Sequence, residues 1–326
     1  MSMRWGILGA ARINRSIIPA LRAAEGHTLE AIASRDGEKA AAAAAEWGIP
    51  RGVTGYEALL ADDEIDAVYI PLPNHLHAEW AVRAAEAGKH VLCEKPLALS
   101  LDEVDRIAAA AAAAHVHVAE AFMYRHHAQT HAVRELIAGG AIGTPRVLRG
   151  CFSFNLDRPG DVRFDAAKGG GALWDVGCYP ISYARTILGA EPDTVQATAV
   201  IGPTHVDMSV AALLRFPGSA IALVDASFVA PFQTGIEVVG SAGTVRVARP
   251  FKPGERETVL VVRDDEVLEH VVESPALYVS QFEDFGRAAR GAEPPVVTLA
   301  DSRANTAVLL AVLESARTGG TARPVS

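Results

Sequence analysis

The stretch His90-Val91-Leu92-Cys93-Glu94-Lys95-Pro96 places a glutamate, a lysine and a proline directly after a short apolar strand. In an open α/β sheet, ligands bind at the carboxyl ends of the strands. Pro96 restricts Lys95 to extended geometry and makes a cis peptide bond feasible, so the ammonium group is held at one point. The alternative is an ordinary strand exit with a surface ion pair. The rest of the chain favours the ligand site.

Length and charge limit the classes of protein to which this chain can belong. The chain has 326 residues, half of them hydrophobic, which is enough for two globular domains with separate cores. Its net charge of −9 argues against a nucleic acid or an anionic membrane as partner, because those contacts need clustered Lys and Arg. A small-molecule ligand is therefore expected.

The cysteines and the amino terminus indicate a cytoplasmic protein. Cys93, Cys151 and Cys178 are an odd number, widely spaced, and are expected to be reduced thiols without a structural zinc. The first residues enter an apolar strand without the features of a signal peptide. The apolar run from Ile107 to Ala114 is far shorter than the roughly 20 residues of a membrane span.

The first third of the chain alternates short apolar strands with helical segments, which is typical of parallel βαβ units. The expected strands are Arg4 to Leu8, Thr28 to Ala33, Gly52 to Val53, Ala67 to Ile70, His90 to Cys93 and Val116 to Ala119. The expected helices are Asn14 to Ala24, Gly37 to Trp47, Tyr56 to Leu60, His77 to Ala87 and Leu101 to Ala114. This pattern predicts an N-terminal Rossmann dinucleotide-binding domain over residues 1–121.

From residue 122 onward the pattern predicts an α+β domain, residues 122–326, with a large, mostly antiparallel open sheet. Strands are expected at Arg146 to Phe154, Thr194 to Ile201, Asp207 to Phe216, Ala220 to Phe228, Gly235 to Val239, Thr244 to Val247 and Thr258 to Val262. Helices are expected at His127 to Ala138, Ala276 to Arg290 and Ala300 to Arg317. The fold class is therefore α/β, and the cleft between two such domains is the default site.

The turn Gly9-Ala10-Ala11-Arg12-Ile13-Asn14 joins the first strand to the first helix. Compared with GxGxxG it keeps only the first glycine, with Ala11 and Asn14 at the other two positions. Alanine still lets a pyrophosphate approach the backbone at the helix start. We expect Gly9, Ala11, Arg12 and Ile13 to bind the cofactor, the alternative being a plain strand-to-helix turn.

The end of the second strand favours NADP over NAD. An NAD site has an acidic residue there to bind the ribose hydroxyls, whereas this chain has Ser34-Arg35, with Lys39 one helical turn further on. A hydroxyl and a guanidinium suit a 2′-phosphate. Asp36 keeps NAD as an alternative, and so does the interpretation of Arg35 as a solvated loop residue.

The segment Tyr69-Ile70-Pro71-Leu72-Pro73-Asn74-His75-Leu76-His77 follows another strand of the predicted sheet. Its prolines stiffen the loop, which suits a flat wall beside a nicotinamide ribose. Cofactor contacts are expected from Pro71, Leu72, Pro73, Asn74 and His77, and also from Glu94 and Lys95. No third ligand is spaced to join His75 and His77, so no metal is expected.

The second chemical segment is Gly169-Gly170-Gly171-Ala172-Leu173-Trp174-Asp175-Val176-Gly177-Cys178-Tyr179-Pro180. A helix that begins near Ala172 would put Asp175 and Tyr179 four residues apart on one face. A phenol beside an ammonium group has a lowered pKa and can act as a general base, and Lys95 could supply that charge. The alternative is that Tyr179 is a core residue and Asp175 a structural acceptor.

Together these segments resemble the family of glucose-fructose oxidoreductase, inositol dehydrogenase and MocA-like proteins, over essentially the whole chain. Within it the chain is most similar to the branch of D-xylose dehydrogenase and dimeric dihydrodiol dehydrogenase. The residues that support this branch are Tyr69 to Asn74, Glu120-Ala121-Phe122-Met123-Tyr124-Arg125, and Tyr179, where the inositol dehydrogenase branch would carry His. The branch usually has proline after the histidine at His127-Ala128, so the pocket shape there is left open.

The resemblance implies a bound nicotinamide cofactor and a homodimer or homotetramer that packs through the C-terminal sheet. It also implies that Tyr179 takes the proton of the substrate hydroxyl, while Lys95 lowers the pKa of the phenol and orients the substrate. Asp175 would position the substrate or Lys95. Further candidates for the substrate pocket are Arg125, His126, Phe154, Arg163 and Trp174.

Three functions remain in competition. The leading hypothesis is an NADP-dependent dehydrogenase of a sugar or another vicinal diol, oxidising a pyranose at its anomeric carbon. A second is a closed-cycle enzyme that retains its cofactor, for oxidoreduction between two sugars or redox-assisted glycoside cleavage. A third is a non-catalytic nicotinamide sensor, which would need neither Lys95 nor Tyr179.

Overall fold

The computed structural model describes residues 2–325, and their contacts divide the chain into two compact units. The first unit holds the residues up to His126 together with Pro275–Arg303, and the second holds His127–Ser274 together with the residues from Ala304 on. The division expected from the sequence lay at 121/122 and assigned residues 275–303 to the second part. The structure groups that segment with the first.

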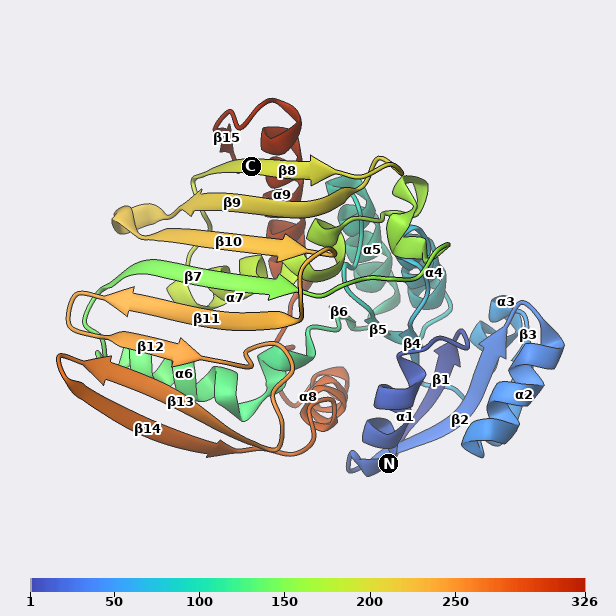
Figure 1. The fold of residues 1–326 in the computed structure, drawn as a ribbon. Helices are drawn as coiled ribbons and strands as arrows, with labels where there is room; N and C mark the ends of the chain where they lie inside the picture. The colour runs from blue at the N-terminus through green and yellow to red at the C-terminus, as the bar shows by residue number, and fades with distance from the viewer. Residues whose placement is uncertain (1, 326) are drawn as a thin grey trace. The chain divides into compact units, whose positions relative to one another are not determined.

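The first unit is built on a parallel sheet with the strand order β3-β2-β1-β4-β5-β6, drawn in blue to teal in Figure 1. Its strands are β1 (Met3–Leu8), β2 (His27–Ser34), β3 (Arg51–Thr54), β4 (Ala67–Ile70), β5 (His90–Cys93) and β6 (Val118–Glu120). Its first helices are α1 (Asn14–Ala23), α2 (Gly37–Trp47), α3 (Tyr56–Leu60), α4 (Asn74–Glu86) and α5 (Leu101–Ala114). The predicted Rossmann domain with a parallel sheet is confirmed.

The sheet of the first unit is covered on both faces. All four residues of β4 are buried, and alternate ones belong to different apolar clusters. Val68 and Ile70 pack in one cluster, whereas Ala67 and Tyr69 pack in the other. Because successive side chains of a strand point to opposite faces, a strand buried on both sides reads as a continuous apolar run.

Helix α8 (Val279–Ala289) packs within the first unit although it lies far along the chain. The rings of Trp5 and Phe282 meet edge to face with centroids 5.2 Å apart, and Phe285 lies 5.4 Å from Trp5. Helical periodicity shows that α8 has an apolar face but does not say which surface it covers. The sequence therefore could not assign this helix to a unit.

The second unit is built on a sheet ordered β14-β13-β12-β11-β7-β10-β9-β8-β15. Its strands are β7 (Pro145–Ser153), β8 (Thr194–Ile201), β9 (Asp207–Arg215), β10 (Ile221–Ser227), β11 (Gln233–Gly240), β12 (Thr244–Val247), β13 (Arg256–Arg263), β14 (Glu266–Glu273) and β15 (Arg323–Pro324). Only β7 and β10 pair in parallel among these described strands, so the predicted mostly antiparallel sheet is confirmed.

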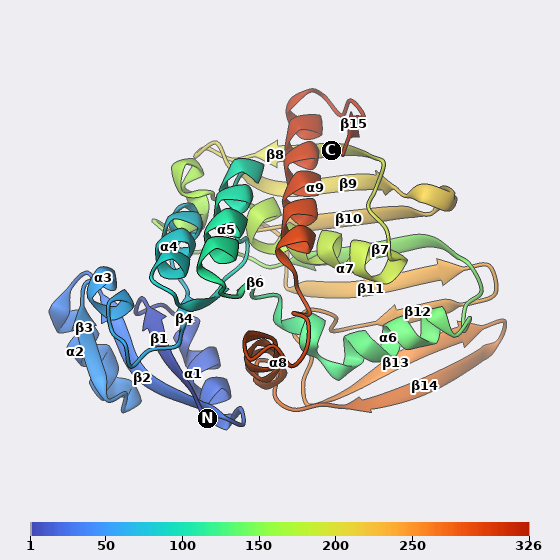
Figure 2. The same ribbon diagram turned by 180° about the vertical axis from the view of Figure 1, so that it is seen from behind.

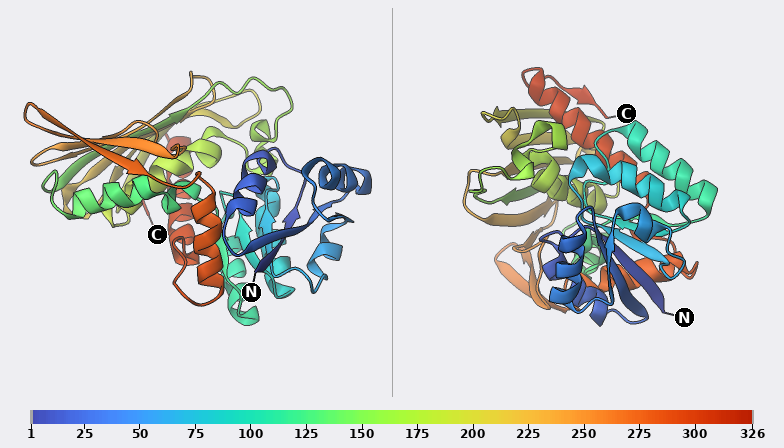
Figure 3. Two further views of the ribbon diagram at one scale, coloured as in Figure 1. Left: turned by 90° about the horizontal axis from the view of Figure 1, so that it is seen from below. Right: turned by 90° about the vertical axis from the view of Figure 1, so that its right-hand side faces the viewer.

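Helices cover one face of this second sheet. Helix α7 (Cys178–Leu188) contacts β7 and β10, and α6 (Ala128–Ala138) contacts β13 and β14. Figure 2 and the left view of Figure 3 show both helices on the same side of the sheet. The last helix, α9 (Leu299–Arg317), begins in the first unit and continues into the second. No helix within residues 2–325 combines the length and apolarity of a membrane span.

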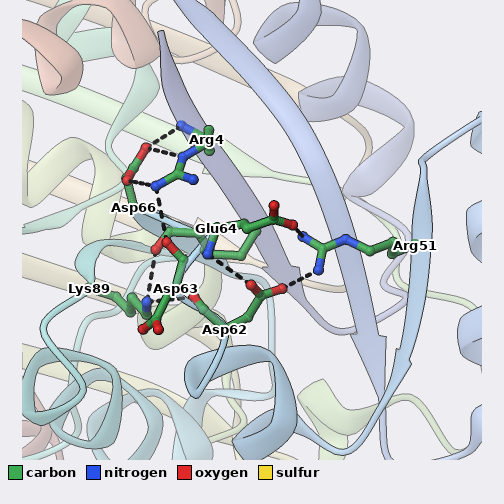
Figure 4. A network of polar contacts seen from close by, with 8 residues as sticks. Arg4, Arg51, Asp62, Asp63, Glu64, Asp66 and Lys89 are labelled. Atoms are coloured by element: carbon green, nitrogen blue, oxygen red, sulfur yellow. Dashed lines mark hydrogen bonds and ion pairs between the residues drawn. The ribbon is translucent and has the colours of Figure 1, made fainter. Parts of the chain in front are cut away.

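A polar network holds the amino ends of the first unit's strands (Figure 4). Arg4 in β1 forms a forked ion pair with Asp66, which precedes β4; the shorter contact is 2.7 Å. Lys89, just before β5, donates to the carbonyls of Asp62 and Ile65 at 2.7 and 2.8 Å. Charged pairs thus fasten this end of the sheet, and the carboxyl ends carry the candidate site.

Candidate functional site

The turn after β1 has the geometry that a dinucleotide fold requires. Gly9 has φ +129°, and a Cβ there would lie 3.1 Å from Leu72. Asn14, at the third position of the glycine motif, donates its side-chain amide to the carbonyl of Gly9 at 3.0 Å. Glycine is therefore required at position 9, because a side chain would meet the neighbouring loop in a strained backbone conformation.

The start of α1 fits an anion. No side chain caps α1, its first turn contains no acidic residue, and Ile13 occupies the N-cap position. Asn14 is buried, and among the described residues its Oδ1 atom has no hydrogen-bond partner. A helix dipole without an acidic side chain near its amino end favours a pyrophosphate here. Arg12 and Ile13 lie in this turn, as predicted.

At the end of β2, Asp36 is engaged by its own helix. Its Oδ1 atom accepts hydrogen bonds from the amides of Glu38 and Lys39 at 3.0 and 3.2 Å, so it caps α2. The Lys39 ammonium lies 3.7 Å from the same carboxylate. Ser34 accepts from the amide of Asp36 at 3.2 Å. Asp36 is thus committed to the helix cap, which weakens it as an acceptor for ribose hydroxyls.

Arg35 is exposed and lies beside Tyr56, a residue that the sequence did not single out. Burial raises the pKa of Tyr56, while the charge of Arg35 and a hydrogen bond to it act in the opposite direction. The Tyr56 ring meets Trp80 edge to face at 4.8 Å, and its hydroxyl lies 4.0 Å from the Cβ position of Gly9. Tyr56 therefore links the Arg35 loop to the glycine turn.

His77 joins two of the predicted loops. Its Nδ1 atom lies 2.7 Å from the carbonyl oxygen of Pro96, and its Nε2 atom lies 2.6 Å from that of Leu72. Burial lowers the pKa of His77, and the two carbonyls oppose this effect. Both ring nitrogens are thus used by the protein backbone. His77 therefore joins the Pro71-Leu72-Pro73-Asn74 loop to the segment after β5.

The segment after β5 is anchored through Glu94. Tyr69 donates a hydrogen bond to Glu94. Burial raises the pKa of Tyr69 well above its usual value, and the carboxylate of Glu94 raises it further, so the phenol keeps its proton. The Lys95-Pro96 bond is cis. The amide of Leu97 donates to buried Glu120 at 2.9 Å, which holds the chain on the other side of Lys95.

Arg125 and His126, two predicted substrate residues, form ion pairs inside the first unit. Arg125 donates to Asp301 at 2.9 Å, and the ring of His126 lies 2.7 Å from Asp284 in α8. These pairs fasten the returning C-terminal segment to a 3₁₀ turn, Met123–His126. Their role toward a substrate stays a prediction.

In the second unit, the glycine-rich segment leads into a π-helix rather than a regular helix. Residues Leu173–Gly177 are π-helical, and the amide of Cys178 donates to the carbonyl of Leu173, five residues back. A helix begins at Ala172, as expected, but its turn over Leu173–Gly177 is a π-helix, and the α-helix α7 starts at Cys178. The alignment of Asp175 with Tyr179 on one face stays a prediction.

Asp175 is held by an arginine. Arg163 Nε donates to Asp175 Oδ2 at 2.6 Å, and Arg163 Nη1 lies 3.3 Å from Asp161. The amide of Arg163 also donates to Asp161 at 3.0 Å. Two predicted site residues, Asp175 and Arg163, are thus direct partners, and neighbouring Trp174 is buried.

Tyr179 is buried in the first turn of α7 among aromatic rings. The centroids of Phe152 and Phe251 each lie 5.5 Å from that of Tyr179, and these two phenylalanines stack on each other at 5.5 Å. The ammonium of Lys252 lies 5.8 Å from the Phe152 centroid, which adds a cation beside the cluster. Phe154, predicted for the pocket, packs against Phe228 at 5.4 Å.

The sequence did not indicate Phe251 and Lys252, because neither belongs to a motif and both lie in the loop after β12. Within residues 2–325 no group of three or more His, Cys, Asp or Glu side chains could hold a metal ion.

Comparison with known proteins matches both parts of the chain. A model of the oxidoreductase family with an NAD-binding Rossmann fold matches residues 3–122, and the GFO/IDH/MocA C-terminal domain matches residues 130–246. The D-xylose 1-dehydrogenase (NADP⁺) 2 of Haloferax volcanii is 41% identical over 322 residues, covering 97% of this chain and 98% of the relative.

Solved structures with the same fold cover nearly the whole chain. A 3-ketoreductase from Actinomadura kijaniata, in complex with NADP and TDP-benzene, is 33% identical with a TM-score of 0.91, covering 97% of this chain and 98% of its own. The aldose-aldose oxidoreductase from Caulobacter crescentus, complexed with glycerol, is 26% identical with a TM-score of 0.91 and covers 99% and 100%.

Proposed function

Because this chain belongs to the GFO/IDH/MocA family of oxidoreductases with an NAD-binding Rossmann fold, we propose that it oxidises a hydroxyl of a sugar or vicinal diol. The most specific form of the proposal is oxidation of a pyranose at its anomeric carbon to a lactone, with NADP⁺ as acceptor. The observation that carries it is buried Tyr179 at the start of α7, in a chain 41% identical to a D-xylose 1-dehydrogenase.

In this proposal the residues of the chain move and hold one proton. Tyr179 reacts as the phenolate, which the ammonium of Lys95 stabilises, and becomes the neutral phenol when it takes the proton of the substrate hydroxyl. Lys95 also orients the substrate. Asp175, fixed by Arg163, positions the substrate from the second unit. A bound nicotinamide supplies the hydride acceptor. The family resemblance assigns Lys95 and Tyr179 to the same hydroxyl.

NADP is the proposed cofactor because Arg35 is exposed and Asp36 is engaged. The guanidinium offers planar, charged donors that suit a 2′-phosphate. The carboxylate that could bind a 2′-hydroxyl instead accepts two amides of α2. Relatives crystallised or named with NADP point in the same direction.

A closed-cycle enzyme is the second candidate. The likeness to an aldose-aldose oxidoreductase, with a TM-score of 0.91, favours it. Such an enzyme would oxidise one sugar and reduce another without releasing the cofactor. Product analysis separates the two cases, because only the dehydrogenase accumulates reduced cofactor in proportion to lactone.

We also propose a homodimer or homotetramer formed through the open face of the second sheet. This face carries a hollow of about 1060 Å³ that is lined by exposed Leu223 and by half-buried Leu213 and Leu260. Arg149 and Arg246 both pair with Glu237 beside it, at 2.5 and 2.9 Å. Apolar residues flanked by charge are typical of an interface.

A cytoplasmic location is proposed as well. No disulfide joins Cys93, Cys151 and Cys178 within the described residues, as expected in a reducing compartment.

The experiment that tests the function measures NADP⁺ reduction across aldoses, polyols and trans-diols. Lys95→Ala and Tyr179→Phe should each lower kcat at least about 100-fold while the Kd for NADP⁺ measured with Tyr179→Phe stays unchanged. Tyr183→Phe is the matched control, since Tyr183 is also buried in α7 and its ring also contacts Phe251, at 6.0 Å. Full activity of Tyr179→Phe would overturn the assignment.

A further inference from the structure

We propose that Asp207 is a positioning residue, whose carboxylate holds the amino end of the π-helix and thereby places Asp175 and Tyr179 for reaction. This inference rests on the proposed function for its catalytic consequence, but the structural role of Asp207 can be tested separately.

The contact is a cap supplied from a distant strand. Asp207 is the first residue of β9 and is only 5% exposed. Its Oδ2 atom accepts the amide of Leu173 at 2.6 Å, and the amide of Ala172 is a further donor to the carboxylate. The position before the π-helix offers no side-chain cap of its own, since it is occupied by Ala172. Asp207 therefore satisfies amides that would otherwise lack a partner.

The same contact explains the third glycine of Gly169-Gly170-Gly171. Gly171 has φ +120°, and a Cβ built there would lie 2.1 Å from Asp207 Oδ1. A side chain at this position would thus displace the carboxylate as well as strain the backbone. Position 171 requires glycine because the carboxylate of Asp207 occupies the space that a side chain would need.

The capped segment is short and irregular, and it carries the chemistry. The π-helix spans only Leu173–Gly177 and contains Asp175, while Tyr179 follows in the first turn of α7. The π-turn continues directly into α7, so its amino end is the first turn of the helix that carries Tyr179. A cap at its first amide therefore controls where the next side chains lie.

Burial of the ionised Asp207 carboxylate is energetically unfavourable. Burial raises its pKa to about 6, although the amides of Leu173, Asp207 and Ala172 and the charge of Arg317 act in the opposite direction. Since the usual pKa of Asp is 3.8, the ionised carboxylate destabilises the folded state above pH 6. A neutral residue would avoid this cost. Strained or unfavourable groups that persist are commonly found at functional sites.

Protonation should weaken the cap. An ionised carboxylate is a stronger acceptor for two amides than the neutral acid, which keeps fewer acceptor sites. Below pH 6 the π-helix should therefore loosen, and kcat should fall with it. Arg317 of α9 is the charged side chain that faces Asp207 from a neighbouring element.

The test combines amide hydrogen exchange with a pH profile of kcat. The variants are Asp207→Asn, which keeps one acceptor oxygen and cannot ionise, Asp207→Ala, and Gly171→Ala. Val261→Ala is the control, because Val261 is buried in β13 of the same unit and its truncation costs stability without touching the cap.

We expect Asp207→Ala and Gly171→Ala to increase exchange in residues 172–179 and to lower kcat about 10-fold to 100-fold, with an unchanged Kd for NADP⁺. Asp207→Asn should keep part of the activity and lose the fall in kcat near pH 6. Val261→Ala should keep the wild-type pH profile and local exchange.

If residues 172–179 of Asp207→Ala exchange their amide hydrogens as slowly as those of the wild type, Asp207 does not cap the π-helix. A pH profile of Asp207→Asn that retains the acid limb would overturn the catalytic consequence. The exchange result is decisive even if the wild type oxidises none of the sugars tested, a result that would count against the proposed function alone.

Discussion

The Nδ1 atom of His77 lies 2.7 Å from the carbonyl oxygen of Pro96, the residue that follows Lys95. The other ring nitrogen is 2.6 Å from the carbonyl of Leu72. One buried side chain therefore joins the proline-rich loop to the strand exit that carries Lys95. The position of the lysine depends on a residue that need not touch substrate or cofactor.

His77→Phe should impair both loops at once. A neutral imidazole donates to only one of the two carbonyls, so the variant leaves one buried carbonyl without its donor, which is expected to cost about 1 to 3 kcal/mol of unfolding free energy. The Michaelis constant for NADP⁺ should rise and kcat should fall about 10-fold because Lys95 is displaced. Urea denaturation and steady-state kinetics measure these effects. His77→Gln restores one donor and should recover part of the stability and part of kcat. Equal losses in His77→Phe and His77→Gln would show that the hydrogen bond of His77 does not hold the two loops.

Arg35→Ala should raise the Michaelis constant for NADP⁺ more than that for NAD⁺. The guanidinium is expected to bind the 2′-phosphate with charge-assisted hydrogen bonds of about 1.5 to 3 kcal/mol, which corresponds to a change of roughly 10-fold to 100-fold. Arg106→Ala is the matched control, since Arg106 is an exposed arginine on α5. Equal effects of Arg35→Ala on the two cofactors would rule out the NADP assignment.

His27 should make the fold sensitive to acid. Burial lowers its pKa to about 4, with a further contribution from the charge of Arg290, and its Nδ1 atom accepts the indole N–H of Trp5 at 2.8 Å. Because the folded pKa lies below the usual 6.5, this contribution to stability is complete above pH 6.5 and is lost as pH falls through 4.

The expected loss is about 3 kcal/mol at full protonation. Denaturation curves between pH 7 and pH 4 should show it in the wild type, and it should be absent in His27→Gln, which keeps an acceptor for Trp5. His131→Gln, at a half-buried histidine, should retain the wild-type pH dependence. The same slope in His27→Gln would refute the assignment.

Leu223→Glu should dissociate the proposed oligomer. Leu223 is 42% exposed and lines the hollow on the open sheet face. A charge there would have to be buried in the interface without a partner. Light scattering after size exclusion measures the mass. Leu268→Glu is the control: Leu268 is 44% exposed but lies on edge strand β14, outside the hollow. An unchanged mass for Leu223→Glu would place the interface elsewhere.

Local signals predicted most elements correctly. Helices α2, α3 and α5 and strands β4, β5, β8 and β12 have the bounds expected from periodicity and capping residues. Strand β14 was missing from the prediction because its residues are mostly exposed and its Val and Leu residues come in adjacent pairs, so apolar and polar residues do not alternate. It forms through its pairing with β13, a contact that the local pattern does not describe.

The residues of the candidate site were likewise predicted where a local motif marks them and missed where it does not. The sequence identified Gly9, Lys95, Asp175 and Tyr179, because each stands in a motif at a strand end or helix start. It missed Tyr56 and Asp207, whose roles come from residues far along the chain: Tyr56 meets Arg35, and Asp207 meets Leu173.

The sequence by itself determined the element order, the Rossmann sheet and the family, because hydrophobic period and turn chemistry act over a few neighbouring residues. Only the tertiary structure decided that α8 joins the first unit, that Asp36 caps a helix, and that the turn with Asp175 is a π-helix whose first amide donates to Asp207. These outcomes depend on buried hydrogen bonds and packing between distant segments, and the energies of such contacts are not encoded in local spacing.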